Sequence, residues 1–266
     1  MTGSSRLLPV LTAPRWHQIP QLEHGFFTRQ GGVSAGDFAE LNFSFKVGDA
    51  PGAVTENWAR ARSHFGGRLD LITMNQVHGA RVIEVDSPVD DPEEADAMIT
   101  SNPGAGLSVL TADCVPLLMV APRARLVASA HAGWRGTLAG VALETVTRMT
   151  QRSNLHPAEI RAALGPSIGP CCYEVDASIA DEIESRWGAM PTAVRRYVLD
   201  GSSKARLDLR AVNIALLMRT GLSRDAIDLI GGCTACDSRF FSHRRATRTR
   251  GTGATGRQLS FIGWSN

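Results

Sequence analysis

The chain has no apolar run long enough to span a bilayer, and its charge is nearly balanced. Its 266 residues carry a formal net charge of +2 at pH 7, which gives no general reason to bind nucleic acid or a membrane surface. The first residues make a poor secretory signal, because Pro9 interrupts a short apolar stretch. We therefore expect a cytoplasmic protein without nucleic-acid or membrane partners.

Cysteine is scarce, and the histidines are not arranged for copper clusters. Five cysteines in a chain of this length do not resemble a disulfide scaffold, so we expect reduced thiols. The seven histidines include no His-x-His pair, which excludes the trinuclear copper cluster of a multicopper oxidase. The signature H-x-E…P-C-x-x-C of cytidine deaminases is also missing. Any deamination would have to use a different zinc site.

The apolar periodicity predicts an α+β fold. A composition that is 43% apolar suits one large domain with a substantial core. Helices and strands alternate without a regular βαβ rhythm, which favours mixed sheets over a doubly wound fold. We expect helices over residues 53–65, 134–149, 177–187 and 209–220, and strands over residues 24–29, 41–45, 81–85, 107–111, 116–120, 126–130, 227–230 and 258–262.

Three residues have the pattern of a metal site: His78, Cys114 and His131. Each follows or ends an apolar, strand-like segment and lies among Gly, Asp or Pro, where active sites tend to be built. Two imidazoles and one thiolate suit zinc, and three protein ligands leave a fourth position for water or substrate. The sequence therefore predicts a catalytic zinc site.

Four other motifs carry weaker signals. Cys171 and Cys172 are adjacent, and Cys233 and Cys236 form a C-x-x-C; neighbouring residues rarely both reach one tetrahedral metal, so we expect core or supporting thiols. The basic stretch 242–250 is expected to be a solvated loop, or alternatively an anion-binding edge near the site. The turn-rich loop 165–170 has the same two interpretations. The G-x-G-x-x-G at 251–256 has no room for the βαβ unit of a dinucleotide site.

Taken together, these motifs resemble the bacterial laccase-domain family. Its members are also called polyphenol oxidase-like proteins, purine nucleoside phosphorylases of the YfiH/YlmD type, or peptidoglycan editing factors. The resemblance runs from about His24 to Ile262 and suggests an N-terminal extension over residues 1–23 and one catalytic domain over 24–266. It rests on the segments Asn75–Gly79, Ala112–Pro116, His131–Gly136, Gly165–Val175 and Phe241–Arg245.

The resemblance implies a single-domain α/β sandwich of mixed sheets with outer helices. It also implies one zinc held by His78, Cys114 and His131, phosphorolysis of adenosine, inosine and methylthioadenosine, and deamination of adenosine. A zinc ion lowers the pKa of water toward neutrality, as attack on the purine C6 requires. We expect small-molecule partners only, namely purine nucleosides and phosphate, and favour a monomer.

Further site residues are expected around this zinc. Arg29 and Arg135 are expected to hold phosphate and to act with Cys114 in catalysis. Asn42, Gln76 and Ser167 are expected to contact substrate. Lys46 stands where many relatives have a histidine, which leaves the role of that position open.

Three alternatives remain. Cys114 could be the nucleophile of a cysteine hydrolase with a histidine base, acting on a peptidoglycan precursor. The zinc could be structural, in a binding protein without catalytic activity. A copper polyphenol oxidase is disfavoured, because no methionine is placed as the axial ligand of a blue-copper site.

Overall fold

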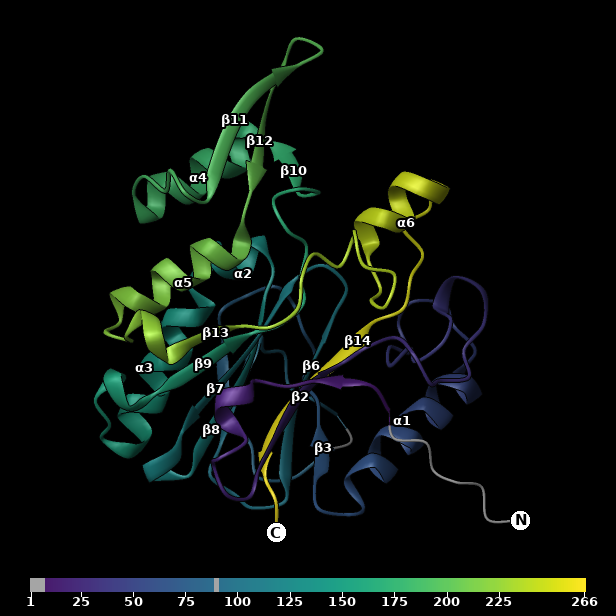
Figure 1. The fold of residues 1–266 in the computed structure, drawn as a ribbon, viewed down its shortest axis with the longest axis vertical. Helices are drawn as coiled ribbons and strands as arrows, with labels where there is room; N and C mark the ends of the chain where they lie inside the picture. The colour runs from purple at the N-terminus through teal and green to yellow at the C-terminus, as the bar shows by residue number, and fades with distance from the viewer. Residues whose placement is uncertain (1–7, 89–90) are drawn as a thin grey trace.

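Two mixed β-sheets pack face to face in the computed structural model, which describes residues 8–88 and 91–266 (Figure 1). The first sheet has the order β1 (Val10–Leu11), β2 (Leu22–Phe27), β14 (Gln258–Trp264), β6 (Ala105–Thr111), β3 (Asp70–Ile72). The second has the order β13 (Ile227–Leu229), β9 (Arg161–Leu164), β7 (Val115–Ala121), β8 (Leu126–Ala132), β5 (Ala97–Thr100), β4 (Val82–Glu84). Each sheet combines parallel and antiparallel neighbours.

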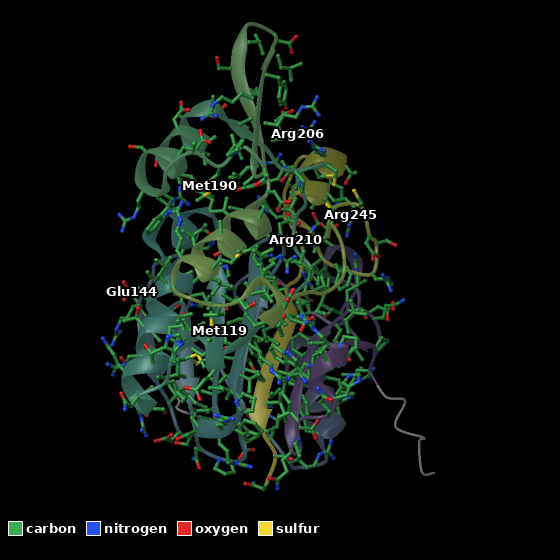
Figure 2. The ribbon with its side chains drawn as sticks, turned by 60° about the vertical axis from the view of Figure 1, so that its left-hand side comes forward. Met119, Glu144, Met190, Arg206, Arg210 and Arg245 are labelled. Carbon is green, nitrogen blue, oxygen red and sulfur yellow. The ribbon has the colours of Figure 1, made fainter. Side chains whose placement is uncertain are left out.

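Alternation along the strands explains why both faces of the second sheet are buried. In β7, Leu118 and Val120 point into the core between the sheets, while Leu117 and Met119 point to the helices on the outer face. Figure 2 labels Met119 on this side. Because successive side chains of a strand face opposite ways, a continuous apolar run fills two cores at once.

Helices cover the outer faces of both sheets. Helix α1 (Pro51–Phe65) packs Val54, Trp58 and Phe65 onto the first sheet and ends at Gly66, which has a φ of 56°. Helices α3 and α5 cover the second sheet, where the Asp208 carboxylate caps α5. The remaining bounds are α2 (Trp134–Ala139), α3 (Val141–Ser153), α4 (Ala177–Trp187), α5 (Leu209–Arg219), α6 (His243–Arg250), with short 3-10 turns at Pro14–Trp16, Gly36–Phe38, Pro122–Ala124, Pro157–Glu159 and Arg224–Ala226.

A small antiparallel sheet stands at the upper end of the molecule in Figure 1, beside α4. Its order is β10 (Glu174–Asp176), β12 (Ser202–Leu207), β11 (Val194–Leu199). The sequence did not predict these strands. Most of β11 is exposed, including Val198 at 71%, so it lacks the alternation that marks a strand with one buried face.

The α+β sandwich expected from the sequence is confirmed, with three local corrections. Residues 41–45 form an irregular loop, because the Asn42 side chain turns the backbone by accepting the N–H of Ser44. The helix expected over 134–149 divides into α2 and α3 at Gly140, whose φ is 91°. The loop expected over 242–250 is mostly helix α6, where the Ser242 hydroxyl accepts the N–H of Arg245.

The N-terminal segment joins the sandwich from Leu8 onward. Strand β1 pairs with β2, and Ala13 and Trp16 are buried between the two sheets. In the part of the chain that the structure describes, no helix is long and apolar enough to cross a membrane.

Candidate functional site

His78, Cys114 and His131 come together at one end of the sandwich, and we call them the His–Cys–His group. Their ligand atoms all lie within 4.8 Å of one another. His131 is near the end of β8, and Cys114 is in the turn that leads into β7. The pairing of Pro116 with His131 in the β7–β8 ladder therefore fixes the thiol beside the imidazole. His78 arrives on the loop after β3.

Asp96, buried just before β5, orients both histidines. Its carboxylate accepts the backbone N–H groups of residues 77–79 and lies 2.8 Å from Nδ1 of His131. This contact favours a proton on Nδ1 and directs Nε2 of His131 toward the group. Burial would raise the pKa of Asp96, but these hydrogen bonds hold it below its ordinary value.

The backbone is strained at two positions of the site. His78 has a φ of 63° and Asp113 a φ of 89°, which cost on the order of 1–3 kcal/mol each for residues other than glycine. Asp96 holds the backbone of His78 in this conformation by accepting its N–H. Asp113 is held through its carboxylate, which accepts the Thr234 hydroxyl at 2.6 Å and the N–H of Arg244 at 2.7 Å. Such strain persists only where the surroundings over-determine it, as at functional sites.

The electrostatics favour a thiolate at Cys114. Burial would raise the pKa of this thiol, but the charge and hydrogen bonds of His131, with smaller contributions from His78, lower it to about 6. Burial lowers the pKa of His131, yet Cys114 and Asp96 raise it to about 9. The pair is therefore a thiolate and an imidazolium near neutral pH when no metal is bound. A deprotonated sulfur is the form needed both by a metal ligand and by a nucleophile.

The His–Cys–His group lines a pocket of about 1090 Å³. Its wall carries aromatic rings, among them Phe45, Trp58 and Tyr173, and Phe45 is 57% exposed. The Arg244 guanidinium lies over the Tyr173 ring at 5.5 Å and donates to the carbonyl of Cys172 at 3.2 Å. Further basic side chains that line the pocket are Lys46, Arg62, His243 and Arg257. The pocket thus combines aromatic faces, cations and a ligand set suited to one metal ion.

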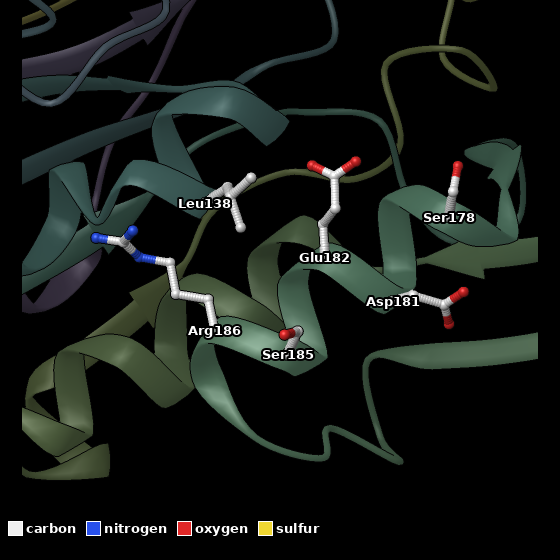
Figure 3. Close-up of a pocket in the computed structure, with 6 residues that line it drawn as sticks. All are labelled: Leu138, Ser178, Asp181, Glu182, Ser185 and Arg186. Carbon is white, nitrogen blue, oxygen red and sulfur yellow. The ribbon is translucent and has the colours of Figure 1, made fainter.

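A second hollow lies between α2 and α4 (Figure 3). Apart from Leu138 it is lined by one side of α4, and it contains neither thiol nor imidazole. Its lining residues are Leu138, Ser178, Asp181, Glu182, Ser185 and Arg186. Because it lacks the groups that carry chemistry in the first pocket, it is not the candidate active site.

Two of the expected substrate contacts, Asn42 and Gln76, make hydrogen bonds within the protein. Asn42 is fully buried, and its amide already bonds to Ser44, to Asp49 and to the N–H of Arg257. Gln76 lines the pocket, but both ends of its amide pair with the backbone of Leu110. The Asn42 amide is thus engaged within the protein, whereas Gln76 reaches the pocket with part of its hydrogen-bonding capacity used by Leu110.

Three other expected residues lie outside the lining of the pocket. Arg29 donates to the carbonyl of Ala39 and lies over the Phe241 ring at 4.5 Å. Arg135 is exposed and lies over Trp134 at 4.6 Å. Ser167 is fully buried, and within the described residues its hydroxyl has no hydrogen-bond partner. The cations that face the pocket are therefore not the expected arginines.

Sequence reasoning missed Asp96, Tyr173 and Arg257. Asp96 follows two glutamates in an acidic stretch, and only its position just before a buried strand distinguishes it. Arg257 lies just beyond the basic stretch 242–250, whose interpretation as an anion-binding edge did point to this side of the pocket. Burial lowers the pKa of Arg257, while the charges of Cys114 and Asp113 act to raise it.

The fold and the site define a class of protein: a double-sheet sandwich with outer helices and one group of two histidines and a cysteine in an open pocket. The chain belongs to the family described as multi-copper polyphenol oxidoreductase laccase, whose model matches residues 23–265.

Relatives with assigned names are similar over most of their length. Purine nucleoside phosphorylase YlmD of Geobacillus stearothermophilus is 38% identical over 250 residues, covering 90% of this chain and 89% of the relative. A purine nucleoside phosphorylase of Deinococcus radiodurans is 37% identical over 258 residues, covering 96% and 93%. The crystal structure of the Geobacillus protein has a TM-score of 0.83 at 34% identity, covering 96% of this chain and 94% of the other. The structure of Bacillus licheniformis YfiH has a TM-score of 0.84 at 32% identity, covering 97% of each.

Proposed function

We propose that this chain is a zinc-dependent purine nucleoside phosphorylase that also deaminates adenosine. The substrates would be adenosine, inosine and methylthioadenosine, and the products of phosphorolysis the free base and ribose 1-phosphate or its methylthio analogue. The names of the relatives support this proposal. The observation that carries it is the pocket that places aromatic faces and cations beside the His–Cys–His group.

The residues of the His–Cys–His group fit zinc. Two nitrogens and one sulfur are donors that Zn²⁺ accepts, and three ligands suit a catalytic site. Gly133 keeps the space beside the ligands open, since a Cβ there would lie 3.1 Å from the Cys114 sulfur and 3.0 Å from the His78 ring. Asp96 supplies the hydrogen bond that fixes the imidazole of His131. A zinc ion held here would supply Lewis acidity to a substrate or water in the pocket.

The anion subsite would be formed by Arg244 and Arg257, and Lys46 also lines the pocket. In phosphorolysis a phosphate oxygen forms a bond to the anomeric carbon while the bond to the purine nitrogen breaks, and the base leaves with the electron pair. The guanidinium groups bind phosphate oxygens through charge-assisted hydrogen bonds and keep the nucleophile close to the sugar. The exposed face of Phe45 would stack on the purine.

Copper oxidase chemistry fits the site less well. In residues 8–88 and 91–266, the groups of metal-binding side chains are the His–Cys–His group and one group of four cysteines. Neither provides the several histidines that a multicopper centre requires. The family description therefore names a chemistry for which the described residues provide no matching group of ligands.

A cysteine hydrolase is the second candidate, and the thiolate–imidazolium pair favours it. The lowered pKa of Cys114, near 6, and the adjacent His131 are what a nucleophilic cysteine needs. Its substrate would be a peptidoglycan precursor. The two candidates differ in their response to chelation, because a thiol hydrolase works without a metal and the zinc enzyme does not.

The experiment is to incubate purified protein with inosine, with and without phosphate, before and after chelation. We expect hypoxanthine only when phosphate is present and zinc has not been removed. Adenosine should give inosine without phosphate, and this activity should also require zinc. Base release that does not depend on phosphate would contradict the phosphorylase assignment, and activity that survives chelation would favour a thiol mechanism.

A further inference from the structure

Four thiols from two segments about sixty residues apart in the sequence come together. We call them the four-cysteine cluster; they are Cys171, Cys172, Cys233 and Cys236. Their sulfur atoms all lie within 4.8 Å of one another, although adjacent cysteines were not expected to reach one metal. None of the four is buried, so they do not serve as core side chains either.

The sulfur–sulfur distances match tetrahedral coordination. The Cys236 sulfur lies 3.4 Å from that of Cys172 and 3.7 Å from that of Cys171. Four thiolates around one zinc, at about 2.3 Å from the metal, lie about 3.8 Å from each other. A disulfide would require about 2.05 Å. The thiols are therefore close to the spacing of shared ligands and far from that of a covalent bond.

The electrostatic surroundings suit the negative charge that four thiolates and a divalent cation carry together. Three arginines from different elements each donate to a backbone carbonyl of the cluster segments: Arg206 to Cys171 at 2.6 Å, Arg210 to Gly231 at 3.3 Å and Arg245 to Thr234 at 2.5 Å. Figure 2 labels these arginines in this part of the molecule. Cations around a metal–thiolate group offset its net charge.

The backbone is also shaped for close approach of the sulfurs. A Cβ at Gly169 would lie 3.2 Å from Cβ of Cys233 and 3.4 Å from the Cys171 sulfur. Gly169, which has no side chain, therefore leaves room for Cys171 and Cys233 to come together.

We propose that the four-cysteine cluster binds a second Zn²⁺ in a closed, structural site that is distinct from the His–Cys–His group. Binding would release the remaining thiol protons to solvent, and no oxidant or reductant is involved. Four protein ligands leave no position for substrate, so this zinc would not take part in the reaction.

The second zinc would hold two loops that support the pocket. Ser167 and Cys233 form a parallel β-bridge, and Ile168 of the same loop lines the pocket. Thr234, which lies between the two ligands of the C-x-x-C, donates to the carboxylate of Asp113, the neighbour of Cys114. A zinc ion in the four-cysteine site would therefore restrict the movement of the segment that positions Cys114.

The test is the zinc content of reduced protein that has been loaded with zinc chloride and desalted, measured by native mass spectrometry. We expect two zinc ions per chain in the wild type and one in Cys236→Ala. Cys114→Ala should also hold one, and X-ray absorption of that variant should show four sulfur neighbours at about 2.3 Å. Ser238→Ala, an exposed change in the same loop, is the control and should hold two.

Three results would overturn the second site. They are a single zinc in the wild type that Cys114→Ala removes, nitrogen neighbours around the zinc of Cys114→Ala, and, in wild-type protein purified without reductant, a mass lower by two hydrogens with a disulfide among these cysteines. A single wild-type zinc that Cys236→Ala removes and Cys114→Ala keeps would support the four-cysteine site and contradict the pocket zinc. The wild-type measurements do not depend on whether a variant folds.

Discussion

The His–Cys–His group and the four-cysteine cluster are linked through the hydrogen bond from Thr234 to Asp113, the neighbour of Cys114. The two groups nevertheless differ in burial and in the charges around them. In the first group a fully buried carboxylate orients a nearly buried imidazole, and the thiol opens onto a pocket. In the second, two of the four thiols are exposed, and arginines bond to backbone carbonyls of the cluster segments. Both are sets of side chains that could hold a metal ion, and the His–Cys–His group is the one that lines the large pocket.

We interpret the His–Cys–His group as the site of the reaction and the four-cysteine cluster as a structural site. Three ligands with an orienting carboxylate leave room for a substrate, whereas four thiolates complete a tetrahedron. The strained residues follow the same division, because His78 and Asp113 belong to the pocket. If this interpretation is correct, changes at the pocket should affect activity first, and changes at the four-cysteine cluster should affect stability first.

The largest effect is expected from Cys114→Ala. Losing one of three ligands should empty the pocket of zinc, and phosphorolysis of inosine should fall by about 1000-fold, since metal polarisation is worth several kcal/mol. The fold should remain, because the sandwich core does not depend on this side chain. Zinc content and circular dichroism measured together check this. A folded variant that retains full occupancy of the pocket zinc would contradict the ligand assignment.

A smaller effect is expected when a pocket cation is removed. Arg244→Ala keeps the backbone N–H that binds Asp113 but loses the guanidinium. Loss of a charge-assisted contact to a partly buried anion costs about 2–3 kcal/mol, so the KM for phosphate should rise roughly a hundredfold. Adenosine deamination, which uses no phosphate, should change much less.

Arg135→Ala is the matched comparison, since Arg135 is exposed and outside the pocket lining. It should leave the KM for phosphate nearly unchanged. If Arg135→Ala raised the KM for phosphate more than Arg244→Ala does, the phosphate would bind near Arg135, as the sequence suggested, and not near Arg244.

Asp96→Asn should weaken zinc binding without removing a ligand. An amide beside Nδ1 of His131 no longer fixes the tautomer that directs Nε2 to the metal, and loss of such a partner costs roughly 10–100-fold in metal affinity. Competition with a chelating dye measures this change. Glu93→Gln, an exposed change in the same acidic stretch, should leave the affinity as it is. If both substitutions lowered the zinc affinity equally, the effect could not be assigned to the contact between Asp96 and His131.

The smallest contrast is how steeply the zinc affinity of each site falls on acidification. Without metal, the pocket holds about one competing proton, shared between Cys114 with a pKa near 6 and His131 with a pKa near 9. In the four-cysteine cluster, hydrogen bonds with the neighbouring thiols raise the pKa of Cys236 to about 12, and the pKa of Cys171 is also raised. More protons compete there, so the zinc affinity of the cluster should fall more steeply as the pH is lowered, which chelator competition at several pH values measures. A steeper fall at the pocket would contradict this contrast.

The sequence predicted the sandwich and the three ligands because both leave local marks. Buried strands such as β7 and β8 are continuous apolar runs, and each ligand follows or ends such a run. The surroundings of the predicted phosphate and substrate residues leave no such local mark. Whether Arg135 or Arg244 faces the pocket, and whether the amide of Asn42 is free, depends on contacts between segments more than a hundred residues apart in the chain. Asp96 and the four-cysteine cluster are likewise products of tertiary packing and not of spacing.

One measurement tests the central claim most directly: the rate of inosine phosphorolysis as zinc is returned to metal-free Cys236→Ser, which keeps only the pocket site. We predict that the rate rises in proportion to added zinc and stops rising at one zinc per chain, with one ribose 1-phosphate formed for each hypoxanthine. A rate that is already full without zinc, or that stays at background when the pocket is loaded, would contradict the assignment of the His–Cys–His group as the centre of a zinc-dependent phosphorylase.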